Sequence, residues 1–339
     1  MLLQRNEKPT DPTHHTTMTK TLASALMLLV LAALPAAAQD DDATNLRPDW
    51  TVGQTATYEF WGKTEKQETA QVFGQERSET TTYVSEGLVK WTVDAVNDDG
   101  SATCSMKLER IKFSVLVGEQ EPVVLDSENL TGERPAFDGL LTGLVAATIK
   151  VNVLPDGSIE SVEGLDAMQQ AAGPEAIEAE LLPEALDFKE SASDLATLIA
   201  APAQATPGQT WNTVNTWNHE DVFPDATTLA QWNTTHTFDS LGEIAGVPIA
   251  TIKTDSDIDI QVDLSQLPEG APDIDIQITD ASGQGEVLFD LSRQEAVARN
   301  ESMSYTAAVT IAPPRPELPP ITIQVVEKNQ AQLLRVSED

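Results

Sequence analysis

The stretch "LVKWTVDAVNDDGSATCSMKLERIKFSV", residues 88–115, decides the fold class. On both sides of residues 97–100, β-branched and apolar residues alternate with polar ones, as in a strand that buries one face. The segment between them is Asn-Asp-Asp-Gly, and these residues tolerate the positive φ of a tight turn. We therefore predict an antiparallel hairpin that turns at residues 97–100.

The same pattern recurs along the chain. A second hairpin is predicted around the Pro-Asp-Gly turn at 155–157, because Ile149, Val151 and Val153 alternate with polar residues just before it. Farther on, residues 285–311 predict another strand pair. Val287, Phe289 and Leu291 would share a face of its first strand, and an unbroken alternation from Met303 through Tyr305 to residue 311 defines its second. The chain is therefore predicted to be mainly β.

Two similar segments suggest an internal repeat. Gly-Gln-Thr occurs at residues 53–55 and 208–210, each time after a turn-forming stretch, and each half of the chain holds three of the six Trp residues. We predict a mainly β (α+β) fold of two tandem antiparallel, curved-sheet or half-barrel-like halves, at residues 39–163 and 207–339. The alternative is two unrelated strands that both begin at a turn.

A helical segment and linker are predicted between the halves, at residues 164–206. Pro174 suits a first helical turn, and Leu195, Leu198 and Ile199 share one side of a second short helix. These helices would either cover an open sheet face or simply connect the two halves.

The N-terminus has the pattern of a secretory signal peptide. Lys20 precedes an apolar run from Leu22 to Leu34, and an Ala-Ala-Ala end follows at residues 36–38. We predict cleavage after Ala38, a true start at Met18, and export to the periplasm or the extracellular space. No later stretch reaches the ~20 apolar residues of a membrane-spanning helix.

The composition is strongly acidic, with 54 Asp and Glu against 20 Lys and Arg and a net charge of −34. Nucleic acids and anionic membrane surfaces are bound through Lys and Arg, so neither is a predicted partner. The charge favours solubility or a cationic partner, including Ca²⁺. The single Cys104 excludes an intramolecular disulfide and is predicted to be a small buried residue.

No catalytic motif is found. The sequence lacks a G-x-S-x-G nucleophile motif and an H-E-x-x-H zinc motif. Beyond the predicted signal peptide the only histidines are His219 and His236, which we interpret as ordinary polar residues. We predict that the protein is not an enzyme and needs no cofactor, with Ca²⁺ as the alternative.

A near-duplication, "DIDIQVD" at 257–263 and "DIDIQIT" at 273–279, places carboxylates on one face of two strands. If the two strands paired, their carboxylates would repel each other unless solvent or a cation relieved them. Hard oxygen ligands suit Ca²⁺, which makes Asp257, Asp259, Asp273 and Asp275 candidate ligands. The alternative is a solvent-facing strand pair whose charges discourage aggregation.

The chain resembles an uncharacterised family of secreted, β-rich bacterial proteins of the planctomycete type. The resemblance rests on "LRPDWTVGQTATYEFW", "VNVLPDGSIESVEGL" and "GQGEVLFDLSRQEAVARNESMSYT", and it implies no activity. The strand reversals also resemble, more remotely, those of periplasmic lipoprotein and lipid carriers, whose curved half-barrel holds acyl chains. That likeness is one of fold, not of function.

Two functions follow as hypotheses. The first is an exported, non-enzymatic protein that binds a hydrophobic small molecule on a curved sheet. The second is a structural or interaction module of the cell envelope, whose acidic strands bind Ca²⁺ or a cationic protein. The candidate ligand-binding residues of the first are Ile149, Val151, Val153, Leu195, Leu198, Ile199, Val287, Phe289, Leu291, Met303 and Tyr305, which could equally form a filled core.

Overall fold

The structure is a computed structural model that describes residues 43–72, 74–132, 135–164, 200–223, 226–264, 272–313, 315 and 318–336. Residues Asp42–Asp339 form one compact unit. The predicted signal peptide and most of the predicted helical segment, including Leu195, Leu198 and Ile199, lie outside the described residues.

The described residues are mainly β, as predicted. The first half contributes β1 (Thr55–Val72), β2 (Gln75–Val96), β3 (Ala102–Val117), β4 (Val123–Asp126), α2 (Pro135–Ala146), β5 (Ile149–Val153) and β6 (Ile159–Glu163). The second half contributes β7 (Thr210–Phe223), β8 (Ala226–Ile244), β9 (Val247–Asp263), β10 (Ile274–Asp290), β11 (Glu295–Ile311) and β12 (Ile321–Val336).

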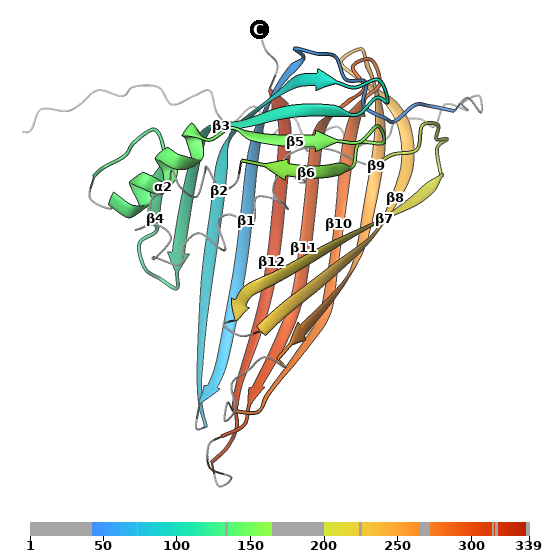
Figure 1. Ribbon diagram of the computed structural model, residues 1–339. Helices are drawn as coiled ribbons and strands as arrows, with labels where there is room; N and C mark the ends of the chain where they lie inside the picture. Colours follow the sequence, from blue (N-terminus) through green and yellow to red (C-terminus); the bar gives the residue numbers. More distant parts are fainter. Residues whose placement is uncertain are drawn as a thin grey trace, which may run out of the picture. The chain divides into compact units, whose positions relative to one another are not determined.

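All twelve strands belong to one open antiparallel sheet (Figure 1). Its order is β6-β5-β3-β2-β1-β12-β11-β10-β9-β8-β7, with β4 paired to the far end of β3. The two halves of the chain are joined where β1 pairs with β12 along fifteen residue pairs, from Thr57↔Val336 to Gln71↔Thr322. The pairing of β1 with β12 therefore joins the two halves into one continuous sheet.

The two Gly-Gln-Thr segments make the same turn. Gly53 has φ 84° and Gly208 has φ 87°, values that favour glycine. The amide N–H of Gly53 donates to the Val93 carbonyl at 2.8 Å, and that of Gly208 donates to the Phe238 carbonyl at 2.7 Å. The prediction that each segment is a turn leading into the first strand of its half is confirmed.

The sheet has an apolar face and a polar face. Successive residues of a strand point to opposite faces, and directly paired residues of neighbouring strands share a face. We call the face that carries Tyr58, its partner Val89 in β2, and Phe289 in β10 the apolar face, and the opposite one the polar face. Two separate hydrophobic cores lie on the apolar face.

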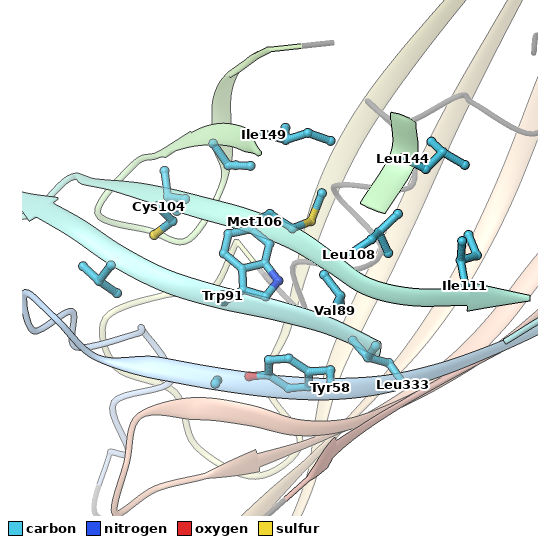
Figure 2. Packing of buried hydrophobic residues seen from close by; sticks show 14 of the residues in the cluster. Tyr58, Val89, Trp91, Cys104, Met106, Leu108, Ile111, Leu144, Ile149 and Leu333 are labelled. Carbon is cyan, nitrogen blue, oxygen red and sulfur yellow. The ribbon is translucent and has the colours of Figure 1, made fainter. Parts of the chain in front are cut away.

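The larger core is built around β2 and β3 (Figure 2). Side chains such as Val89, Trp91 and Met106 are buried there together with Tyr58 from β1 and Leu333 from β12. The same core takes in α2, a helix the sequence reading missed, through Leu140, Leu141 and Leu144. Its signals were Pro135 at the first position and leucines one turn apart, which Gly139 and Gly143 obscured. Among the described residues, no helix is long and apolar enough to cross a membrane.

The smaller core lies in the second half. It gathers Phe238 from β8, Ala250 and Ile252 from β9, and Val287 and Phe289 from β10. Leu46, which lies ahead of β1 in the chain, is also buried here. This core therefore fastens the N-terminal segment to the second half of the sheet.

Cys104 is fully buried in the larger core, as predicted. Burial, reinforced by the nearby Asp94 carboxylate, raises the pKa of its thiol to about 12. Because only the thiolate reacts with disulfide reagents, we expect the native protein at pH 8 to react with Ellman's reagent roughly a thousand times more slowly than the denatured protein. Stoichiometric labelling of the native protein within minutes would contradict this burial.

Candidate functional site

A second apolar surface lies outside both cores, on the apolar face of β10, β11 and β12. Its residues form a grid of three neighbouring rows, each with one residue from every strand. The rows are Ile278–Ala307–Val325, Ile276–Val309–Ile323 and Ile274–Ile311–Ile321. We call these nine residues the β10–β12 patch.

Every residue of the patch is half-buried, and none belongs to a core cluster. The patch lies at the N-terminal end of β10, whereas the smaller core takes Val287 and Phe289 from the C-terminal end of that strand. On the polar face of the same strands, Gln277, Ala308 and Gln324 are exposed. The patch therefore keeps apolar area in contact with solvent on one face only.

Two further apolar residues extend the patch onto β1. The β1 residue Ala70 pairs with Ile323 of β12, and Val72 follows it two positions later on the same face. Beyond Ala70 the row ends at Arg77 of β2. The apolar surface thus spans four strands and stops at a charged side chain.

A polar band separates the patch from the cores. The Oη hydroxyl of Tyr305 donates to Oε2 of Glu327 at 2.8 Å, and Nδ2 of Asn329 donates to Oε1 of the same carboxylate at 3.0 Å. The Oδ1 atom of Asn329 is buried without a hydrogen-bond partner in the described part of the chain. Glu327 also pairs across the strands with Lys66 of β1. The band therefore offers both acceptors and a cation beside the patch.

The structure separates the predicted ligand-binding residues into two groups. Met303 and Tyr305 are half-buried on the apolar face next to the patch. Ile149, Val151 and Val153 belong to the larger core, Val287 and Phe289 belong to the smaller core, and Leu291 packs against the smaller core. The sequence predicted strands at residues 273–279 and 285–311 but not the patch, because no local pattern shows that β12 pairs with β11.

The supposed pairing of the two acidic segments is wrong. Residues 258–263 of β9 pair with β8, and residues 274–279 of β10 pair with β11. Asp259 therefore lies in a different strand pair from Asp275, Asp257 pairs with Asn233 of β8 and Ser282 of β10, and Asp273 precedes β10. Among the described residues, no three His, Cys, Asp or Glu side chains gather as metal ligands.

His236, in β8, has a strongly lowered pKa. Its ring stacks on Trp211, with centroids 5.3 Å apart and planes 12° from parallel. Its Nε2 lies 2.8 Å from Oγ1 of Thr213, and its buried Nδ1 has no hydrogen-bond partner in the described part of the chain. Burial, and then the positive charge of Arg299, lower the pKa of His236 to about 4. A neutral, packed imidazole of this kind is a structural residue.

A buried carboxylate marks the seam between the halves. Burial raises the pKa of Glu295, against the opposing effects of Arg335 and Arg293. The Nε of Arg335 lies 3.0 Å from Oε1 of Glu295, and the Tyr58 hydroxyl donates to the Ala296 carbonyl at 3.1 Å. These contacts tie β1, β11 and β12 together, and we assign them a structural role.

Comparisons with known proteins place part of the chain in a family but give no activity. A model described as "Family of unknown function (DUF6263)" matches residues 99–291, more than half of the chain. No curated protein matches the sequence.

One solved structure that the comparison matches is described as "Lipid-protein interactions in lipovitellin", with 8% sequence identity and a TM-score of 0.42. The match covers 85% of this chain and 25% of that one, so this chain spans a quarter of its length. A TM-score this low supports no functional argument.

Proposed function

This chain belongs to DUF6263, a family of unknown function, and we propose that it is an exported, non-enzymatic binding protein. Its ligand would be a single-chain lipid with a zwitterionic head group, whose acyl chain lies on the β10–β12 patch. The observation that carries the proposal is the patch itself: nine apolar side chains in register on one face, half-buried and outside both cores.

The free energy of binding would come from the apolar area that the patch leaves in water. Burying apolar surface contributes roughly 25 cal/mol per Å². Three neighbouring strands each present three such residues, so an acyl chain laid along the strands contacts apolar atoms over roughly 14 Å of its length. On the polar face of the same strands, Asp275 and Gln277 replace the isoleucines, which limits the site to one face.

The size of the patch favours a lipid over a protein partner. With strands about 4.8 Å apart and a rise of about 3.4 Å per residue, the grid measures roughly 14 Å along the strands and roughly 10 Å across them. A stable protein interface buries about 800 Å² on each partner, several times this area. A single acyl chain needs no larger surface.

The polar band gives the ligand an orientation. Glu327 lies one row above Val325, at the edge of the patch, and it already accepts hydrogen bonds from Tyr305 and Asn329. A head group with a positive end would meet this carboxylate while its tail lies on the patch. An anionic head group is disfavoured by the net charge of −34.

The absence of a nucleophile or zinc motif in the sequence supports a non-enzymatic role, and the N-terminal pattern of Lys20, an apolar run and Ala38 supports export. One specific observation favours the alternative, an acidic envelope module: the arrangement of the acidic segments in β9 and β10.

We expect the full chain, purified without detergent, to bind a fluorescent lysophosphatidylcholine. Replacing one row of the patch, in the triple variant Ile276→Thr, Val309→Thr and Ile323→Thr, should weaken this binding about tenfold or more, because three apolar contacts are lost. The matched control replaces the opposite face of the same strands, with Gln277→Thr, Ala308→Thr and Gln324→Thr, and should bind like the wild type. Titration of the lipid fluorescence measures both.

Native mass spectrometry of the same preparation tests the proposal without a probe. An added mass that extracts as lipid would support it. Equal affinities for the patch variant and its control would overturn it. So would a bare mass together with a wild-type protein that does not bind the probe, because the patch would then be covered by another part of the protein.

A further inference from the structure

The sheet divides between β9 and β10. The two strands pair only between Ile249–Asp257 of β9 and Ser282–Asp290 of β10. Beyond that point, residues 258–263 of β9 pair with β8 alone, and residues 274–279 of β10 pair with β11 alone. We call these two unpaired edges, within the described residues, the fork; Figure 1 allows the two strands to be followed.

A β-bulge in β10 lies at the point of division. Thr279 pairs with Thr306 and Ser282 pairs with Ser304, so Asp280 and its successor face a single residue of β11. Asp280 has a left-handed φ of 56°. The extra residue reverses the alternation of β10, whereas β9 continues to pair with β8 in unbroken register down to Asp263. The pairing of β9 with β10 ends at this bulge, and each strand continues with its other neighbour.

Both edges of the fork present the same pattern of side chains. On the apolar face, β9 carries Ile258, Ile260 and Val262, and β10 carries Ile274, Ile276 and Ile278. On the polar face, each edge carries an Asp whose Oδ2 accepts a hydrogen bond from a Gln two residues later. The distances are 2.9 Å for Gln261 to Asp259 and 3.0 Å for Gln277 to Asp275.

Among the described residues, no ion pair engages the carboxylates of Asp259 and Asp275 in the fork. The ion pairs within the described part of the chain engage other acids, and the nearest Lys of β9, Lys253, is paired with Asp239 at 2.8 Å. Asp259 and Asp275 take part in none of these ion pairs. Within the described part of the chain, the polar face of the fork therefore carries negative charge without a paired cation, beside two strand edges that have no neighbour there.

We propose that the fork binds an extended segment of a partner protein whose cationic and apolar side chains alternate. Such a segment would pair its backbone with an open edge and add a strand to the sheet. Its Lys or Arg side chains would meet Asp259 or Asp275 on the polar face. Its apolar side chains would continue the isoleucine rows on the other face, because the side chains of a strand alternate with a period of two.

A second copy of this chain does not fit this description. Two molecules that each carry a net charge of −34 repel each other, and the edges of the fork would set Asp against Asp, which destabilises strand pairing. The charge therefore selects a basic partner. Either edge requires the same alternation of side chains, so one partner segment fits the edge of β9 as well as the edge of β10.

Synthetic peptides test the proposal on the full chain. The probe is a fluorescein-labelled peptide of four Lys-Val repeats, and its control has the same composition with four Lys followed by four Val. By fluorescence anisotropy at 150 mM salt, the alternating peptide should bind at least ten times more tightly than the block peptide. Equal affinities would overturn the proposal, because they would indicate general attraction to an acidic protein.

A pair of variants locates the binding. Asp259→Asn together with Asp275→Asn should weaken the alternating peptide about tenfold. Asp98→Asn together with Glu119→Gln makes the same charge change in two exposed turns and should leave its affinity unchanged. An equal loss in both variants, or no loss in either, would overturn the assignment to the fork. The lipid titration is independent of these results, so either proposal can fail alone.

Discussion

The substitution Gly87→Ala is expected to lower the free energy of unfolding by about 3 kcal/mol. Gly87 is buried in β2 opposite Phe60 of β1. A Cβ at this position would lie 2.4 Å from the backbone carbonyl oxygen of Arg110 and 2.6 Å from two carbons of the Phe60 ring. The carbonyl belongs to β3 and cannot yield without disturbing the sheet, so the strands must separate. Urea denaturation followed by Trp fluorescence measures the loss.

Gly283→Ala is the matched control. Gly283 also lies on the apolar face of a central strand, but a Cβ there would meet its nearest atom, Cβ of Ser256, at 3.4 Å, an ordinary contact. Alanine also costs less conformational entropy than glycine on folding. We expect this variant to differ from the wild type by less than about 1 kcal/mol. A comparable loss in both variants would show that the close approach of β3 to Gly87 is not the cause.

Acidification is expected to destabilise the protein through His236. The pKa of this residue is lowered from 6.5 to about 4 in the folded state, so the unfolded chain takes up a proton first as the pH falls. The contribution of neutral His236 to the free energy of unfolding is therefore fully present above pH 6.5. It is lost as the pH falls from 6.5 to 4. A shift of this size corresponds to about 3 kcal/mol. Urea denaturation at a series of pH values measures it.

The variant His236→Gln isolates this effect. Glutamine does not titrate, so the difference in unfolding free energy between wild type and variant should change by about 3 kcal/mol from pH 7 to pH 4. Other groups cancel in this difference. Among them is Glu295, whose raised pKa acts with the opposite sign and adds stability as the pH falls. A difference that stays constant with pH would mean that His236 is solvated in the native protein.

Mutations in the two cores and mutations in the patch are expected to affect stability differently. Phe238, Val89 and Val151 are fully buried, so their truncation would create cavities and unfold the protein before any binding could be measured. The patch side chains are half-buried and can be exchanged for threonine at lower cost. Binding and stability can therefore be tested separately in this sheet.

Local patterns in the sequence predicted the individual strands well. The turn at residues 97–100, the buried alternation of Ile149, Val151 and Val153, and the strand character of residues 257–263 were all predicted and are confirmed. These features depend on residues close together in the chain. Period-two alternation identifies a strand and its buried face, and Gly, Asn and Asp identify the turns, whatever the neighbours of that strand are.

The tertiary structure alone decided which strands are neighbours, and with them the candidate sites. No local pattern requires β1 to pair with β12 across most of the chain, yet this pairing turns the two halves into one sheet. The β10–β12 patch exists because Ile276, Val309 and Ile323, from three strands, fall in one row. Likewise, the identical Asp-Ile repeats suggested a pair, but one pairs with β8 and the other with β11. A strand records its own alternation in its sequence, but its register and partner depend on distant strands whose patterns are interchangeable.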